Sequence, residues 1–259
     1  ELASELRYSI LTKLAERMYK QNEIAKELDM TLQESHRQFE RLINTGLVKK
    51  NLDGLLSLMS YGKIIVIQLN SFSFLRQNID YFKDHTIEYL PIKFLRRIGD
   101  LHNSKFREGS YVNNEEWKSI LTEAEEYTKI ISSQVPPDAF KLAISMISKK
   151  EITVYLIHGE NTIIPRCFKE ELIDSDFALH LRSLISRGVY QRKMVKRVEL
   201  MMVFNEKRGI ILFPNLKGKV DLDYSFLSDD PLFHEWCNDY FNDVWQEAGV
   251  YDVNKLREF

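Results

Sequence analysis

The chain has 259 residues, of which 44% are hydrophobic and 29% are charged, and its formal net charge is −2. These values are typical of one large or two modest globular domains, and they exclude wholesale disorder. A net charge near zero provides no general attraction to nucleic acid or to an anionic membrane, so any such attraction must come from local patches. The longest apolar run, residues 64–69, is too short to cross a bilayer. No basic-then-apolar leader is visible, and we expect a cytoplasmic protein.

The two cysteines, Cys167 and Cys237, lie far apart and form no CxxC pair. This spacing excludes the common zinc-finger patterns and a scaffold held together by disulfides. Histidine and cysteine do not cluster at metal-ligand spacing anywhere else in the sequence. We therefore expect neither a metal nor a cofactor.

The first thirty residues carry the pattern of two helices. Apolar residues at intervals of four predict a helix over residues 4–19. A second, shorter helix is predicted over residues 22–29, with Asn22 as its N-cap. A turn at Met30 then leads into a third helix.

A third helix and two short extended segments follow the first two helices. Thr31 and Glu34 form the S/T-x-x-E pattern of a capping box at the start of this helix, and Gly46 is typical of its end. Ser35 shares the inner face with the apolar positions Leu32, Phe39, Leu42 and Ile43 and is small enough to lie under the second helix. Two short extended segments follow, joined by the hairpin-type turn at Asp53-Gly54. Three helices and a hairpin predict a winged helix-turn-helix.

The segments after this domain change in pattern twice. Apolar residues spaced by three and four from Tyr61 to Phe82 predict one helix with a seam close to that of a coiled coil, suited to dimerisation. A second helical block is predicted over residues 113–135, before Pro136-Pro137. Strands and helices then alternate. The predicted strands are 151–158, 187–193, 197–205 and 208–214, and the predicted helices are 138–148, 169–186 and 231–248.

The predicted fold class is therefore α+β or α/β, with a winged helix-turn-helix, a linking helix and an α/β domain built on a central sheet. We expect the domains to be residues 1–60, 61–84 and 85–259. The helix over 231–248 carries Phe233, Trp236, Cys237, Tyr240 and Phe241 on one broad face, and we expect it to belong to the core.

Motifs of the common enzyme classes are absent from the sequence. It contains no GxGxxG, GxxxxGK[ST], GxSxG or HExxH pattern, and no histidine begins the HxK pair of phospholipase-type phosphotransferases. His234 precedes Cys237 by three residues, but neighbours in sequence are weak support for a Cys/His dyad. We do not expect catalysis.

The third helix and the hairpin carry the residue types of a DNA-reading surface. A recognition helix contacts bases from its exposed N-terminal residues, while neighbouring basic and hydroxyl side chains contact phosphates. Gln33, His36 and Arg37 are expected to face base edges, because Gln and Arg make bidentate contacts to adenine and guanine. The residues expected to contact the backbone of double-stranded DNA are Thr31, Arg41, Lys49 and Lys50.

The same surface has a second interpretation. Residues 1–60 hold nine basic and nine acidic residues, so non-specific attraction to phosphate would be weak. Glu34 is explained by capping, and Glu40 is expected to pair with Arg37 or Arg41. Winged helices also serve as protein-docking modules, and charged helix faces are often only solvated. Docking on the transcription machinery without reading DNA therefore stays open.

Three segments resemble one family. The stretch IAKELDMTLQESHRQFERLINTGLV resembles the helix-turn-helix of archaeal winged-helix regulators. Residues 81–101, YFKDHTIEYLPIKFLRRIGDL, and the closing run 204–245 resemble the sensor domain of archaeal regulators related to the methanogen filamentation regulator. The resemblance implies a homodimeric transcription regulator whose C-terminal domain senses a signal, and it identifies no ligand residues.

Charge in the C-terminal half is uneven. Residues 182–208 hold eight Lys and Arg residues, whereas residues 220–243 hold seven acids and no Lys or Arg. We expect these stretches to complement each other within or between subunits, with an anion site or a basic surface that assists DNA binding as the alternatives. For a small anionic effector the expected contacts are His158, at the end of a predicted strand, and Arg192. An enzyme built on this α/β domain is the remaining alternative.

Overall fold

The computed structural model describes residues 5–258, apart from the side chain of Asn161. The chain forms two compact units, Glu1–Phe74 and Leu75–Phe259, which we call the N-terminal and C-terminal domains. Among the described residues, no helix has both the length and the apolar character needed to span a bilayer.

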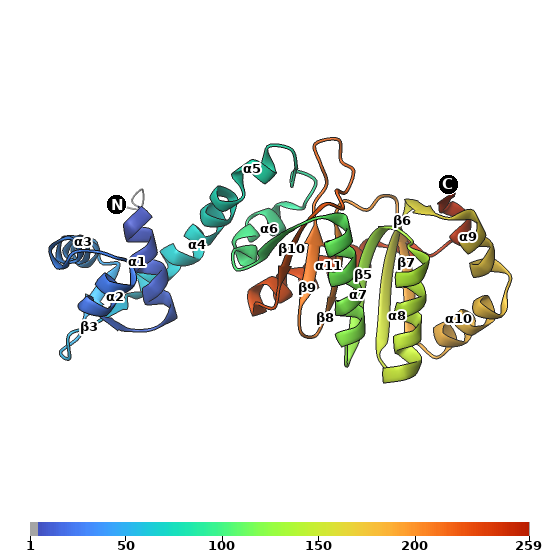
Figure 1. Ribbon diagram of the computed structural model, residues 1–259, viewed down its shortest axis with the longest axis horizontal. Coiled ribbons are helices and arrows are strands. Elements are labelled where there is room, and N and C mark those ends of the chain that lie inside the picture. Colours follow the sequence, from blue (N-terminus) through green and yellow to red (C-terminus); the bar gives the residue numbers. More distant parts are fainter. Residues whose placement is uncertain (1–4, 259) are drawn as a thin grey trace. The chain divides into compact units, whose positions relative to one another are not determined.

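The N-terminal domain is a winged helix-turn-helix, as predicted (Figure 1). A three-stranded antiparallel sheet with the strand order β1-β3-β2 accompanies its helices. The short strand β1 was not predicted. The elements are α1 (Glu5–Glu16), β1 (Tyr19–Lys20), α2 (Gln21–Glu27), α3 (Leu32–Asn44), β2 (Val48–Lys50), β3 (Leu55–Leu58) and the start of α4 (Ser60–Gln77).

The packing of α2 on α3 follows the predicted pattern in its centre and departs from it at the ends. Ser35 is fully buried, and its Oγ accepts a hydrogen bond of 3.0 Å from Gln21 Nε2. Phe39 and Leu42 are buried in the same core, with Ile10, Leu11, Leu14 and Ile24. Leu32 and Ile43 were expected to face inward but are 68% and 37% exposed, because they lie at the edges of the buried stripe.

The N-cap of α3 was predicted correctly, but in the described chain the Glu34 carboxylate does not complete the predicted capping box, and the N-cap of α2 was predicted wrongly. Thr31 Oγ1 accepts a hydrogen bond of 3.1 Å from the Glu34 amide. Helix α2 begins earlier than expected, with Lys20 as its N-cap and Asn22 inside the helix. The Lys20 amide donates to Glu23 Oε2 at 2.6 Å, so a carboxylate from the first turn satisfies this end of the helix.

The helix predicted over 61–82 is divided. Helix α4 ends at Gln77, and a short helix α5 (Ile79–Phe82) follows Asn78, whose φ of −113° is not helical. The apolar spacing of three and four continues across Asn78, so spacing alone does not reveal the interruption.

The C-terminal domain is an α/β structure built on a mixed sheet (Figure 1). In the described part of the chain the sheet has nine strands, in the order β11-β7-β6-β5-β8-β9-β10-β4, with β12 paired to β6. Its elements after α5 are α6 (Ile92–Leu95), η1 (Ile98–Leu101), β4 (Lys105–Glu108), α7 (Ser110–Glu123), β5 (Tyr127–Gln134), α8 (Pro137–Lys150), β6 (Thr153–Ile164), α9 (Arg166–Ile173), α10 (Asp176–Ser186), β7 (Tyr190–Val195), β8 (Met201–Asn205), β9 (Gly209–Leu212), β10 (Tyr224–Ser228), α11 (Pro231–Glu247), β11 (Gly249–Val250), η2 (Val253–Lys255) and β12 (Arg257–Glu258).

Three parallel strands form the centre of this sheet. Strands β5 and β7 both pair with β6 in parallel, and the other pairings along the main strand order are antiparallel. Parallel neighbours need crossover connections, which α8 supplies between β5 and β6, and α9 with α10 supplies between β6 and β7. Helices α7 and α8 lie side by side across the sheet (Figure 1).

Two predicted helices were wrong in extent. The block over 113–135 is helical only as far as Glu123, because the β-branched run after Tyr127 pairs with β6 and β8 as strand β5. The helix over 169–186 is two helices, α9 and α10, and the Ser175 side chain caps the second by accepting from the Ala178 amide at 3.1 Å.

Helix α11 belongs to the core, as predicted. Phe233, Trp236 and Cys237 are fully buried, and Trp236 Nε1 donates to the Phe94 carbonyl at 3.3 Å. Burial raises the pKa of the Cys237 thiol. The neighbouring His234 contacts the end of strand β8, where its Nε2 lies 2.9 Å from the Asn205 carbonyl oxygen.

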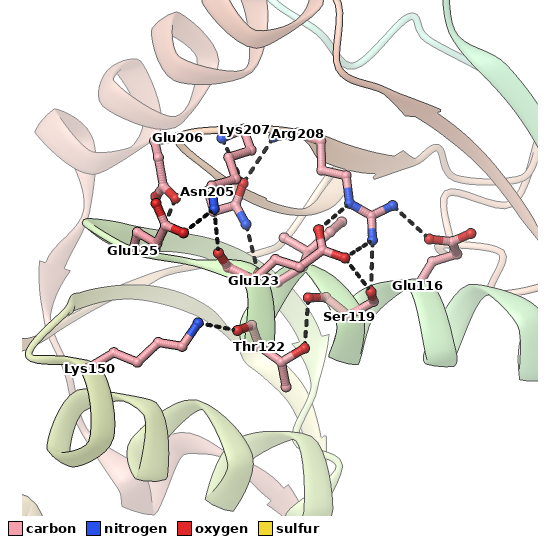
Figure 2. Close-up of polar contacts among 11 residues, drawn as sticks. Glu116, Ser119, Thr122, Glu123, Glu125, Lys150, Asn205, Glu206, Lys207 and Arg208 are labelled. Atoms are coloured by element: carbon pink, nitrogen blue, oxygen red, sulfur yellow. Dashed lines mark hydrogen bonds and ion pairs between the residues drawn. The ribbon is translucent and has the colours of Figure 1, made fainter.

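The basic stretch 182–208 and the acidic stretch 220–243 were expected to complement each other within or between subunits, and within one chain they pair with other segments. Figure 2 shows Arg208 reaching α7 instead, with Nε 2.7 Å from Glu123 and Nη1 2.8 Å from Glu116. The acidic stretch pairs with Lys93 and Arg97. Among residues 5–258 no ion pair joins the two stretches. The expected pairing within one subunit is therefore wrong, and pairing between subunits stays a prediction.

Candidate nucleic-acid interface

The outer face of α3 presents a row of polar side chains to solvent. Gln33, His36, Arg37 and Arg41 are exposed on this helix, and Thr31 is exposed at its N-cap. The buried face of the helix, with Ser35, Gln38, Phe39 and Leu42, fixes its rotation about its own axis. The five predicted residues therefore lie together on one ordered, solvent-facing surface.

The wing lysines are carried by strand β2. Lys49 and Lys50 are both exposed, next to the buried Val48. The turn after them is held by Asn51, whose Oδ1 accepts from the Leu55 amide at 2.8 Å, and by Gly54 at a φ of +78°. A left-handed φ favours glycine, so the sequence defines this tight hairpin.

The acidic residues on this surface are arranged differently from the prediction. Glu40 was expected to pair with Arg37 or Arg41, but its Oε2 lies 3.7 Å from His36 Nδ1, one helical turn back. Within the described chain, Arg37, Arg41, Lys49 and Lys50 make no ion pair with an acidic residue. We call these four side chains the unpaired cations.

Two other cations of the domain, Lys13 and Arg17, are paired with acidic residues outside α3. Lys13 Nζ lies 3.4 Å from Glu27 and 3.5 Å from Glu16. Arg17 Nη2 lies 3.7 Å from Glu27 as well. Lys13 and Arg17, in and just after α1, are therefore paired with acids, whereas the four cations on α3 and the wing are not.

The two residues predicted for an effector lie on neighbouring strands of the C-terminal domain. His158 is on β6 and Arg192 is on β7, where Arg192 pairs in register with Leu156. Both contact Tyr251, which the sequence did not single out. His158 Nδ1 lies 3.4 Å from the Tyr251 hydroxyl, and the Arg192 guanidinium lies 4.3 Å from the centre of its ring.

His158 is held in its neutral form. It is 2% exposed, and burial, assisted by the charge of Arg192, lowers the pKa of its imidazole to about 3. Arg192 is not among the residues that line the nearby cavity, whereas His158 is.

This cavity has a volume of about 310 Å³ and lies between helices α7 and α8 and the sheet. Its floor includes Ser132 on β5, Leu156 and His158 on β6, and Tyr190 on β7. Helices α7 and α8 contribute, among others, Trp117 and Phe140. Sequence patterns show which of these residues face inward but not that a space remains between them. In the described residues, no group of three His, Cys, Asp or Glu side chains has the arrangement of a metal site.

No protein-family model and no curated protein sequence matches the chain. Several solved structures are similar to this one. They include TrmBL2, an archaeal chromatin protein, at 10% sequence identity and a TM-score of 0.40; the similarity covers 96% of this chain and 95% of that one. NucT from Helicobacter pylori is similar at 12% identity and a TM-score of 0.38, over 57% of this chain and 100% of that one. Nuc from Salmonella typhimurium, a phospholipase D family member, is similar at 11% identity and a TM-score of 0.39, over 57% and 99%. At these values the likeness carries no functional argument.

Proposed function

We propose that the chain is a transcription regulator that binds double-stranded DNA through its N-terminal domain, with α3 in the major groove. The observation that carries this proposal is the set of unpaired cations on α3 and the wing, next to the exposed amide of Gln33. Positive side chains without acidic partners are free to contact phosphates and base edges. The resemblance of this segment to archaeal winged-helix regulators agrees with the proposal.

The position of each side chain suggests its role. Gln33 and Arg37 lie in the first half of α3, where a recognition helix meets base edges, and they are suited to adenine and guanine. His36 is held beside Glu40 and is therefore less available to a base. Thr31 and Arg41, at the two ends of the helix, and Lys49 and Lys50 on the wing would contact the DNA backbone.

Replacing Arg37 with alanine is expected to cost about 1–3 kcal/mol at a specific site and to relax the base preference there. The reason is that a bidentate contact to guanine is lost, while the phosphate contacts remain. The measurement is the affinity for the preferred duplex and for single-base variants of it, followed by fluorescence anisotropy.

Replacing Lys50 with alanine is expected to weaken binding to all sequences alike and to lower the slope of log affinity against log salt by about 1. Lys26→Ala on α2 is the matched control, because Lys26 is exposed outside α3 and the wing. Identical behaviour of the Arg37 and Lys50 variants would contradict the assignment of Arg37 to base reading. Unchanged DNA binding in both would favour a protein-docking role.

We propose further that the regulator is a homodimer joined through α4. Tyr61, Ile64 and Phe72 are 57%, 59% and 70% exposed, and the spacing of these residues brings them to one side of the helix. A stripe of large apolar side chains on a helix needs a partner, and a second copy of α4 provides a complementary one. Two copies would present two recognition helices to a two-fold symmetric site.

Replacing Ile64 with glutamate is expected to convert the dimer to a monomer, because two carboxylates would be buried at the seam. The measurement is the molar mass in solution by light scattering after gel filtration. Lys63→Glu is the control, since Lys63 is exposed and next in sequence to the stripe. A dimer that persists in Ile64→Glu would place the subunit contact elsewhere.

We also propose that the C-terminal domain senses a small molecule. The supporting observation is the cavity of about 310 Å³ between α7, α8 and the sheet, which is mainly apolar with a few polar groups, as small-molecule sites commonly are.

A further inference from the structure

The cavity between α7, α8 and the sheet has no charged side chain in its lining. Its walls are mainly aliphatic and aromatic, with Ile144 and Ala143 on α8 facing Ile130 and Leu156 on the sheet. The polar members of the lining are serines, amides, one histidine and one tyrosine. A charged ligand would lose its hydration here without gaining an ion pair, which is strongly unfavourable.

One buried polar atom of the lining residues is closed to the cavity. The Tyr190 hydroxyl has no hydrogen-bond partner within the described chain, and it is too deeply buried for a ligand in the cavity to contact it. Burial raises the pKa of Tyr190, so the phenol keeps its proton and adds no charge to the lining.

The other polar side chains differ in how far they are already satisfied. Ser132 Oγ donates to the Gln134 carbonyl at 2.7 Å, and Asn113 Nδ2 donates to the Leu222 carbonyl at 2.8 Å. His158 is neutral and uses Nδ1 toward Tyr251. The hydrogen-bonding groups of the lining are therefore all uncharged.

From this lining we infer that the cavity binds an uncharged, mainly apolar small molecule. As the effector site of a regulator, the inference rests on the proposed function; as a binding site, it stands on the cavity alone. It also differs from an anionic effector held by Arg192, whose guanidinium lies over Tyr251 instead. An apolar cavity of about 150 Å³ is known to suffice for benzene, so a space of about 310 Å³ can hold a substituted ring.

Three small molecules of nearly equal shape separate the effect of charge from that of a carbonyl acceptor: acetophenone, ethylbenzene and benzoate. Acetophenone is neutral with a carbonyl acceptor, ethylbenzene lacks the acceptor, and benzoate carries a charge. Titration calorimetry on the full chain without DNA is expected to show acetophenone binding at least ten-fold more tightly than benzoate. Ethylbenzene, which is neutral as well, should also bind at least ten-fold more tightly than benzoate.

Two variants test whether the neutral probes bind in this cavity. Ala143→Phe places a ring in the cavity and should abolish binding of both neutral probes, with the fold checked by tryptophan fluorescence. Tyr155→Phe is the matched control, because Tyr155 lies on β6 but contacts Trp245 of α11 rather than the cavity. No binding of acetophenone at millimolar concentration would overturn the inference, and a cavity filled only by water would give this result. Benzoate binding as tightly as acetophenone would overturn it as well. Because no DNA is present, these outcomes are independent of whether α3 reads DNA.

Discussion

Replacing Gly62 with valine is expected to destabilise the N-terminal domain by about 3 kcal/mol or more. Gly62 lies in the first turn of α4 and is buried. A Cβ atom at this position would lie 2.2 Å from the Leu47 carbonyl oxygen and 3.0 Å from its carbonyl carbon. Because the obstacle is backbone, it cannot rotate away as a side chain would, and α4 or the start of the wing must move.

The measurement is amide hydrogen exchange, read separately for peptides of residues 5–74 and of residues 75–258. Protection in the first set should fall by about two orders of magnitude, the factor that corresponds to 3 kcal/mol, while the second set stays unchanged. Lys63→Val is the control, since it adds the same β-branched residue at an exposed position of the same helix. Equal protection in the Gly62 and Lys63 variants would show that α4 does not pack closely on Leu47.

Acidification from pH 7 to pH 4.5 is expected to cost the C-terminal domain about 3 kcal/mol through His158 alone. The pKa of its imidazole is about 3 in the folded domain, compared with the ordinary value of 6.5 in the unfolded chain. Between these two values the unfolded chain binds a proton that the folded domain does not. Stability is therefore unaffected by this group above pH 6.5 and declines as the pH falls below it.

The measurement is urea unfolding at several pH values, followed by tryptophan fluorescence. All three tryptophans, Trp117, Trp236 and Trp245, lie in the C-terminal domain, so the signal reports on that domain. His158→Gln should remove most of the loss between pH 7 and pH 4.5, whereas His180→Gln, at an exposed site on α10, should not. An equal pH dependence in wild type and His158→Gln would show that the imidazole is solvated.

The N-terminal domain was predictable because its signals are local. The Thr31 cap, the small Ser35 under α2 and the Asp53-Gly54 turn each act within a few residues. The cap of α2 was missed because a carboxylate from Glu23, rather than a side chain at the N-cap itself, satisfies the helix end. The exposure of Arg37 and Arg41 followed from helical periodicity, but the pairing of Glu40 with His36 did not.

The C-terminal domain was harder to predict because its strands are specified by distant partners. Strand β5 continues the helical spacing of α7, and only pairing with β6 and β8 makes it extended. The cavity was not predictable, because its lining comes from elements between Ser110 and Leu222 and depends on how their side chains fail to fill the space. Tyr190 reads in the sequence as an ordinary strand residue, and its unpartnered hydroxyl becomes evident only from packing.

The central claim is that the full chain reads DNA through α3, and selection from a random duplex library tests it most directly. The account predicts enrichment of a two-fold symmetric sequence with half-sites about one helical turn apart. It also predicts that affinity for the enriched duplex falls steeply with salt and exceeds that for random duplex at every salt concentration. Absence of enrichment, together with an affinity that does not depend on salt, would contradict it.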